Sequence, residues 1–242
     1  MSAALICQRL EELAGVTDTP GEITRLYLSP AHRRAVGLIE SWMCEAGLAT
    51  RRDSLGTLIG RHDGTNPDAP ALLIGSHIDS VRDAGRFDGP LGVMLAIGVV
   101  ERLRAQGRTL PFAIEVVAFG DEEGVRFPSA LGSSRALAGA FYPALLDERD
   151  QDGISRREGL RAFGCDPDDW RQAAMKPGTI GYVEAHIEQG PVLEAEGLAL
   201  VLAVRNRSGT TAANGRERYS RRAKALIQVG AQTAANQALA TS

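Results

Sequence analysis

Three apolar segments of strand length in this chain each end beside side chains that commonly bind metal ions. The segments span residues 71–75, 111–119 and 179–187, and the residues at their ends are His77, the pair Glu122 and Glu123, and His186. Short apolar runs between turn signals are typical of buried strands. Because patterns of helical spacing separate these runs, we expect a layered α/β sheet, in which ligands collect at the carboxyl ends of the strands.

The expected helices lie between the strands and cover both faces of the sheet. Ser29 and Pro30 form a helix start, an N-cap followed by proline at the first helical position, and the apolar spacing continues to Gly47. Residues 89–106 are mostly apolar and carry arginines near their end, which is typical of a buried helix. Further helices are predicted at residues 1–15, 133–140, 154–163 and 166–175, and a hairpin of two short strands at 48–62.

At 242 residues and 44% hydrophobic composition, the chain is long enough to bury a full core. Its three cysteines, Cys7, Cys44 and Cys165, are widely spaced and odd in number, so they provide neither a disulfide framework nor a Cys-x-x-Cys metal site. This favours a reducing compartment, and we expect a cytoplasmic protein. No apolar run approaches the roughly 20 residues of a membrane span, so no membrane partner is expected.

Charge is unevenly distributed along the chain. The net charge is −3, but residues 205–242 hold seven basic residues and a single acid, Glu217. A basic segment can contact nucleic acid, yet the only aromatic residue within this one is Tyr219, and it matches no recognition motif. We therefore expect no nucleic-acid partner.

The residues at the strand ends match the needs of a site for two divalent ions. Such ions, about 3.5 to 4 Å apart, need one carboxylate that bridges them. Asp88 lies in the segment Gly-Arg-Phe-Asp-Gly, whose glycines let the backbone approach closely, so it is the candidate bridge. His77 and His186 would complete one ion, and Glu123 would begin the other.

Two further acids are assigned supporting roles. Asp79 is expected to accept the hydrogen bond from the second ring N–H of His77, which fixes the imidazole. Glu122 is expected to take a proton from water and pass it to the leaving nitrogen. Each residue alone has a plainer explanation, since a single histidine is often structural and an acidic run is often a solvated turn. Their combination favours a metal site, because carboxylates crowded together without a cation raise one another's pKa.

The other two histidines have no such neighbours in the sequence. We expect His32, on the helix after Pro30, and His62, beside a loop, to lie on the surface. Residues 132–135, Gly-Ser-Ser-Arg, could contact a substrate, but a helix start is the simpler interpretation.

Four segments together resemble the allantoate amidohydrolase and N-carbamoyl-L-amino-acid hydrolase family. They are Gly-Ser-His-Ile-Asp-Ser at 75–80, Gly-Arg-Phe-Asp-Gly at 85–89, Phe-Gly-Asp-Glu-Glu-Gly-Val-Arg-Phe at 119–127 and Glu-Ala-His-Ile-Glu-Gln-Gly-Pro at 184–191. Members of this family are dinuclear metal amidases related to the aminoacylase-type metallopeptidases. The likeness extends over about residues 5–202, and the first three segments look most like the allantoate branch.

The resemblance implies a zinc-exopeptidase-like catalytic domain with a role for each candidate residue. The implied metal ligands are His77, Asp88, Glu123 and His186, with Glu122 as general acid/base, Asp79 supporting His77, and Gln189 contacting the substrate. It also implies two divalent ions, zinc or manganese, and hydrolysis of a ureido C–N bond in a small ureido acid, with release of ammonia and carbon dioxide. Allantoate is the first substrate implied, and an N-carbamoyl-L-amino acid is the alternative.

Relatives in this family are longer than this chain. After the segment that contains His186 they insert a dimerising lid domain, then return to the catalytic domain for its last strands and last histidine ligand. We therefore expect residues 1–202 to be the N-terminal part of the catalytic domain and residues 203–242 to be an atypical basic, low-complexity tail. On this interpretation the chain is truncated and lacks the lid, the family homodimer loses its dimerising surface, and the second ion lacks ligands. The alternative to an impaired hydrolase is a non-catalytic remnant that binds at most one metal.

Overall fold

The computed structural model describes residues 1–198, 200–205, 211–212 and 226–231, with side chains described for residues 1–198 and 200. In chain order the elements are α1 (Ala3–Ala14), α2 (Pro30–Glu45), β1 (Ala49–Arg52), β2 (Leu58–His62), β3 (Ala71–His77), α3 (Pro90–Ala105), β4 (Ala113–Phe119), α4 (Gly132–Leu137), the 3₁₀ helix η1 (Pro143–Asp147), α5 (Arg156–Ala162), the 3₁₀ helix η2 (Pro167–Ala173), β5 (Gly181–His186), α6 (Val192–Ala195), β6 (Val201–Arg205), β7 (Thr211–Ala212) and β8 (Leu226–Ala231).

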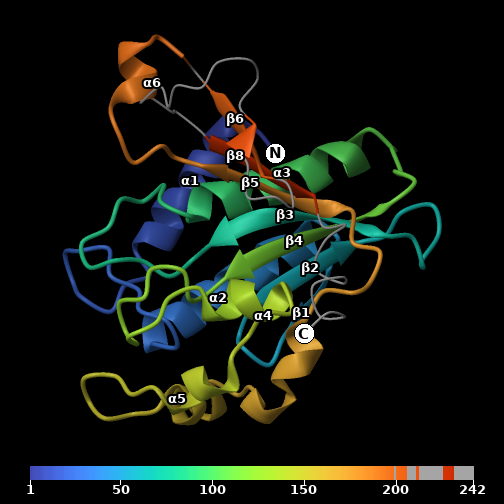
Figure 1. Ribbon diagram of the computed structural model, residues 1–242. Coiled ribbons are helices and arrows are strands. Elements are labelled where there is room, and N and C mark those ends of the chain that lie inside the picture. The colour runs from blue at the N-terminus through green and yellow to red at the C-terminus, as the bar shows by residue number, and fades with distance from the viewer. Residues whose placement is uncertain (199, 206–210, 213–225, 232–242) are drawn as a thin grey trace.

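The strands of the described residues form one mixed sheet in the order β1-β2-β4-β3-β5-β8-β6-β7 (Figure 1). β1 and β2 are the predicted antiparallel hairpin. β4, β3 and β5 run parallel to one another at the centre, as expected for strands joined by helical crossovers. β7 and β8 fall within residues 203–242, and β8 pairs with β5. The division of the chain at residue 203 stays a prediction.

The sheet divides the core into two layers, and β4 shows why. All seven residues of this strand are buried, as is typical of a strand with both faces covered. Its side chains alternate between two apolar clusters. The larger cluster includes residues of α1, α2 and α3 and contains Ile114, Val116 and Ala118 of β4. The smaller cluster includes Leu137 of α4 and contains Ala113, Val117 and Phe119 of β4. The predicted α/β sheet with helices on both faces is therefore confirmed (Figure 1).

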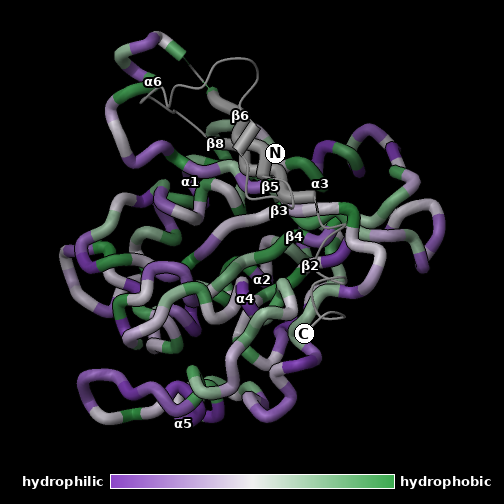
Figure 2. Tube along the Cα trace, in the orientation of Figure 1, coloured by the Kyte–Doolittle hydropathy of each residue, from purple (hydrophilic) through white to green (hydrophobic). Residues whose placement is uncertain are grey.

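The helices begin where the sequence signals predicted. The Ser29 hydroxyl caps α2 by accepting the backbone N–H of His32 at 3.0 Å, and Pro30 is the first helical residue. The segment predicted as a helix at 166–175 is instead a 3₁₀ helix, with a non-helical backbone at Asp169. Figure 2 shows hydrophobic residues along the central strands and hydrophilic residues around α5. No helix among the described residues is long and apolar enough to cross a membrane.

The prediction that His32 lies on the surface is wrong. Its side chain is fully buried, its Nδ1 accepts the backbone N–H of Leu28 at 3.1 Å, and its ring stacks on Phe163 with 5.1 Å between centroids. Burial lowers the pKa of His32 to about 4, so the ring is neutral. The physical reason lies in the helix period, since His32 precedes the buried Val36 and Ile39 by four and seven residues.

Candidate metal centre

The three predicted strand ends meet at one edge of the sheet. His77 is the last residue of β3 and lies opposite Phe119, the last residue of β4. His186 is the last residue of β5, which pairs with the other side of β3. Because the three strands are parallel neighbours, their carboxyl ends bring the two histidines and the turn after Phe119 together.

The imidazoles of His77 and His186 face each other through their Nε2 atoms, which are 3.2 Å apart. The Nδ1 of His77 lies 3.0 Å from the backbone oxygen of Asp79, and that of His186 lies 2.8 Å from the backbone oxygen of Ile187. Because a carbonyl only accepts, each Nδ1 carries a proton, and the Nε2 of a neutral ring is then a bare lone pair. Two bare nitrogens at this distance require a proton or a cation between them.

The spacing of these two nitrogens suits a bound metal ion. Zinc binds imidazole nitrogen at about 2.0 to 2.1 Å in a tetrahedral arrangement, which places two such ligands about 3.4 Å apart. His186 Nε2 is also 3.3 Å from an Asp88 carboxylate oxygen, and His77, Asp88 and His186 offer ligand atoms that all lie within 4.8 Å of one another. The donor set of two imidazoles and a carboxylate fits zinc or manganese.

Two local features hold this group of three. The side-chain amide of Gln189 donates to both Asp88 carboxylate oxygens, at 2.7 and 2.6 Å. Gly89 has a φ of +85°, and a Cβ at this position would lie 2.6 Å from the ring of His77. Glycine at position 89 therefore lets the backbone pass against the imidazole, as the sequence suggested.

A second group consists of His77, Glu122 and Glu123, whose ligand atoms also lie within 4.8 Å of one another. The Oε1 atom of Glu123 is buried and has no hydrogen-bond partner in the structure. A buried carboxylate oxygen without a partner is costly, and a cation would satisfy it. Burial also raises the pKa of Glu122 and of Glu123 above the usual value.

The two groups differ from the predicted arrangement in the residue that they share. Among the described residues, no group of this kind contains both Asp88 and Glu123, and the common member is His77. Asp88 is instead engaged by Gln189. The bridging role of Asp88 stays a prediction, as do the roles assigned to the other site residues.

Asp79 contacts the acidic turn more closely than it contacts the imidazole. Its carboxylate accepts the backbone N–H of Glu122 at 3.0 Å and that of Glu123 at 3.1 Å, whereas it lies 3.6 Å from His77 Nδ1. Burial lowers the pKa of His77, but the Asp79 carboxylate outweighs this effect and raises that pKa to about 9. Asp79 thus links the turn of the second group to the histidine that both groups share.

The cavity beside these groups has a volume of about 520 Å³, and some residues that line it are not among the sequence-predicted site residues. Tyr182 and Glu184 precede His186 by four and two residues on β5, so all three share one face of the strand. Glu184 accepts a hydrogen bond from the Ser76 hydroxyl at 2.6 Å. The period of two within β5 was the signal that would have identified them.

Known proteins resemble this chain over most of its length. The profile of peptidase family M20/M25/M40 matches residues 73–240. An N-carbamoyl-L-amino acid amidohydrolase from Geobacillus stearothermophilus is 52% identical over 193 residues, which cover 79% of this chain and 47% of that protein. An allantoate deiminase from Arabidopsis thaliana is 45% identical over 197 residues, which cover 79% of this chain and 38% of that protein.

Solved structures agree with the sequence relatives. A crystal structure of a hydantoinase/carbamoylase family amidase from Burkholderia ambifaria superposes with a TM-score of 0.75 and 37% identity, and the match covers 81% of this chain and 48% of that one. The chain spans less than half the length of the Geobacillus and Arabidopsis relatives. The family resemblance predicted from the four motifs is confirmed.

Proposed function

Because this chain belongs to peptidase family M20/M25/M40, we propose that it carries the metal site of an amidohydrolase that cleaves a ureido or carbamoyl C–N bond. The observation that carries this proposal is the approach of His77 Nε2 to His186 Nε2 at 3.2 Å, beside the unpartnered Oε1 of Glu123. A proton on one imidazole or a bound cation would satisfy the two nitrogens, and a cation would satisfy the Glu123 oxygen as well. The family relation then indicates the type of reaction.

The residues fall into a stronger and a weaker metal site. His77, Asp88 and His186 would hold one zinc or manganese ion, because they supply three ligand atoms that lie within 4.8 Å of one another. Glu123 would contribute to a second ion, which is held less tightly because the single free lone pair of His77, at Nε2, can bind only one of the two ions. When bound, such ions polarise the carbonyl under attack and lower the pKa of a coordinated water.

Glu122 is the proposed general acid/base. It belongs to the second ligand group, and burial raises the pKa of its carboxyl, which favours its taking up a proton. It takes a proton from the water that adds to the ureido carbon and passes it to the nitrogen that leaves. The C–N bond to that nitrogen breaks and leaves a carbamate. The carbamate loses carbon dioxide as its own C–N bond breaks, so one ureido group with one water yields an amine, ammonia and carbon dioxide. Asp79 orients the turn that carries Glu122 by accepting its backbone N–H.

The substrate proposed is a small ureido acid. The cavity of about 520 Å³ is of a size that takes small molecules, and Gln189 lines it next to Asp88. Allantoate is the first candidate, from the motifs. An N-carbamoyl-L-amino acid is the second candidate. It is supported by sequence identity, which is 52% to the Geobacillus amidohydrolase and 45% to the Arabidopsis deiminase. We also propose a cytoplasmic location, which the three free cysteines favour. The family resemblance implies a homodimer, but we expect this chain to lack the lid domain that forms it.

The test is to measure metal binding and turnover separately. Purified chain is titrated with Mn²⁺ or Zn²⁺, and ammonia release is then followed with allantoate and with several N-carbamoyl-L-amino acids. The proposal expects at least one tightly bound ion per chain and ammonia from one substrate class. One bound ion without ammonia would support the alternative, a metal-binding protein without catalysis. Folded chain that binds neither ion would contradict the metal site itself.

A further inference from the structure

Asp121 is a buried acid that directly precedes the pair Glu122 and Glu123, yet it belongs to neither ligand group. Its carboxylate forms an ion pair with the guanidinium of Arg156, the first residue of α5. Both side chains are almost completely removed from solvent, with 2% of Asp121 and none of Arg156 exposed. The carboxylate of Asp121, next in sequence to two candidate metal ligands, is therefore paired with Arg156, which is distant in sequence.

Arg156 connects the turn after β4 to two other segments. Its Nη2 donates to the backbone oxygen of Ser129 and to the carboxylate of Glu148, both at 2.9 Å. Its Nε donates to the backbone oxygen of Leu145 at 3.2 Å. Each guanidinium nitrogen thus has an acceptor, which offsets the cost of burying the charge. The position of Asp121 is fixed relative to the whole segment from 129 to 148.

Gly132 closes the other side of the Asp121 carboxylate. Its backbone N–H donates to Asp121 Oδ2 at 3.2 Å, and a Cβ at this position would lie 2.6 Å from the same oxygen. Any larger residue would displace the carboxylate. The Gly-Ser-Ser-Arg segment, which the sequence singled out without assigning a function, therefore has a packing role next to the acidic turn.

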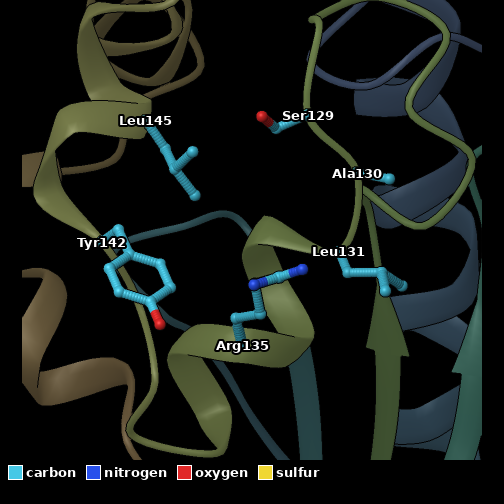
Figure 3. A pocket seen from close by; sticks show the side chains of 6 residues that line it. All are labelled: Ser129, Ala130, Leu131, Arg135, Tyr142 and Leu145. Carbon is cyan, nitrogen blue, oxygen red and sulfur yellow. The ribbon is translucent and has the colours of Figure 1, made fainter.

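Two of the segments that Arg156 connects face each other across a cavity. Figure 3 shows Ser129 and Leu131 on one side of a cavity and Tyr142 and Leu145 on the other, with Arg135 between them. The volume of this cavity is about 240 Å³. The guanidinium of Arg156 links the two sides by binding the backbone oxygens of Ser129 and Leu145, and the Ser129 hydroxyl also donates to the carboxylate of Glu148.

We propose that the Asp121–Arg156 pair is a positioning device that sets the distance of Glu122 and Glu123 from His77. The inference rests on the metal site proposed above. The acidic turn is held at two points, by Asp79 on its amides and by Arg156 on Asp121. A buried ion pair is often replaceable by apolar residues without loss of stability, so stability alone does not account for it. Residues that orient metal ligands typically change metal affinity roughly 10- to 100-fold when replaced.

The first test compares two arginine variants of the full chain by Mn²⁺ calorimetry, with folding checked by circular dichroism. Glu123→Gln first defines the part of the binding that depends on the acidic turn. Arg156→Gln is expected to weaken that part roughly tenfold and to leave the remaining binding within about twofold. The control is Arg9→Gln. Arg9 is a buried arginine paired with Glu45 of α2 and with Glu101, which lies near the C-terminal end of α3, whereas Asp88 directly precedes the N-terminal end of that helix. It should leave all Mn²⁺ binding unchanged.

The second test moves Asp121 without removing a charge. Gly132→Ala places a methyl group against the carboxylate, while Gly37→Ala adds one to α2 where no atom lies within 4 Å. The first should weaken the same part of the Mn²⁺ binding and speed hydrogen exchange at the amides of Glu122 and Glu123, and the second should do neither. If Arg156→Gln does not fold, Gly132→Ala alone tests the positioning role.

The outcomes separate the two proposals. Wild-type chain that binds Mn²⁺, with Arg156→Gln and Gly132→Ala binding it equally well, overturns the positioning role and leaves the metal site intact. Wild-type chain that binds no Mn²⁺ overturns the metal site and the positioning role together. Weaker binding in Arg9→Gln and Arg156→Gln alike would show a general effect of lost buried charge, and it too overturns the positioning role.

Discussion

Two histidines of this protein are buried almost equally but differ in charge. Burial lowers the pKa of His32, a residue of α2 that stacks on Phe163, to about 4, whereas the pKa of His77 is raised to about 9 because the Asp79 carboxylate outweighs burial. The first is a neutral part of the core, and the second attracts a positive charge. The comparison teaches that neighbouring carboxylates, and not depth in the fold, distinguish the candidate metal centre from the rest of the interior.

The largest effect is expected when His77 is replaced, because it belongs to both ligand groups. His77→Ala should lower the affinity for Mn²⁺ more than about 100-fold, as measured by calorimetry. The matched control is His32→Gln, which changes the other buried histidine and should keep Mn²⁺ affinity within about twofold. An equal loss in both variants would break the distinction between the two histidines.

A large effect on turnover, but not on metal binding, is expected at Glu122. Glu122→Gln removes the proposed acid/base, so the rate of ammonia release should fall about 10²- to 10⁴-fold while the bound ions are retained. The control is Glu194→Gln in α6, an exposed glutamate that should have no effect. A Glu122→Gln variant with the wild-type rate would assign the proton transfer to another group.

A moderate effect is expected from His32 on stability as a function of pH. Its pKa is about 4 in the folded chain and about 6.5 when unfolded, so the unfolded chain binds the extra proton first as the pH falls. The contribution of His32 to the free energy of unfolding is therefore fully present above pH 6.5 and decreases toward pH 4, by about 3 kcal/mol at most. Urea denaturation between pH 7 and pH 4 measures this slope, which should be smaller in His32→Gln. An unchanged slope would mean that other groups cause the acid sensitivity.

The smallest effect is expected at the edge of the site. Gln189 is exposed but donates to both oxygens of Asp88, so Gln189→Ala should weaken Mn²⁺ binding about tenfold. Gln151→Ala, in an exposed loop, is the control. If Gln189→Ala binds Mn²⁺ more tightly than the wild type, the amide competes with the ion for Asp88 and does not orient it.

The sequence predicted the parts of the site that follow from local patterns. Apolar runs located β3 and β5, and because parallel strands end at one edge, His77 and His186 were expected to meet. The Ser29-Pro30 start of α2 was equally local. The surface prediction for His32 is wrong because a polar residue type is a weaker signal than helix period, and its spacing to Val36 and Ile39 indicates the buried face.

The remaining features depend on contacts between distant segments. Nothing near Asp121 in the sequence indicates Arg156, because the ion pair joins a turn after β4 to the start of α5. Likewise, the sharing of His77 between two ligand groups is a matter of distances, which spacing along the chain does not specify. Tyr182 and Glu184 are intermediate between local and long-range features. The sequence does not single them out, but once β5 is assigned, their alternation with His186 places all three on one face of the strand.

The central claim is that the Nε2 atoms of His77 and His186 bind one cation together with a carboxylate. Anomalous diffraction from crystals grown with Zn²⁺ tests it most directly, because it locates the ion without reference to activity. The account predicts a peak about 2.0 to 2.1 Å from both Nε2 atoms and within bonding distance of Asp88. A protein saturated with Zn²⁺ that shows its anomalous peaks only elsewhere would contradict it.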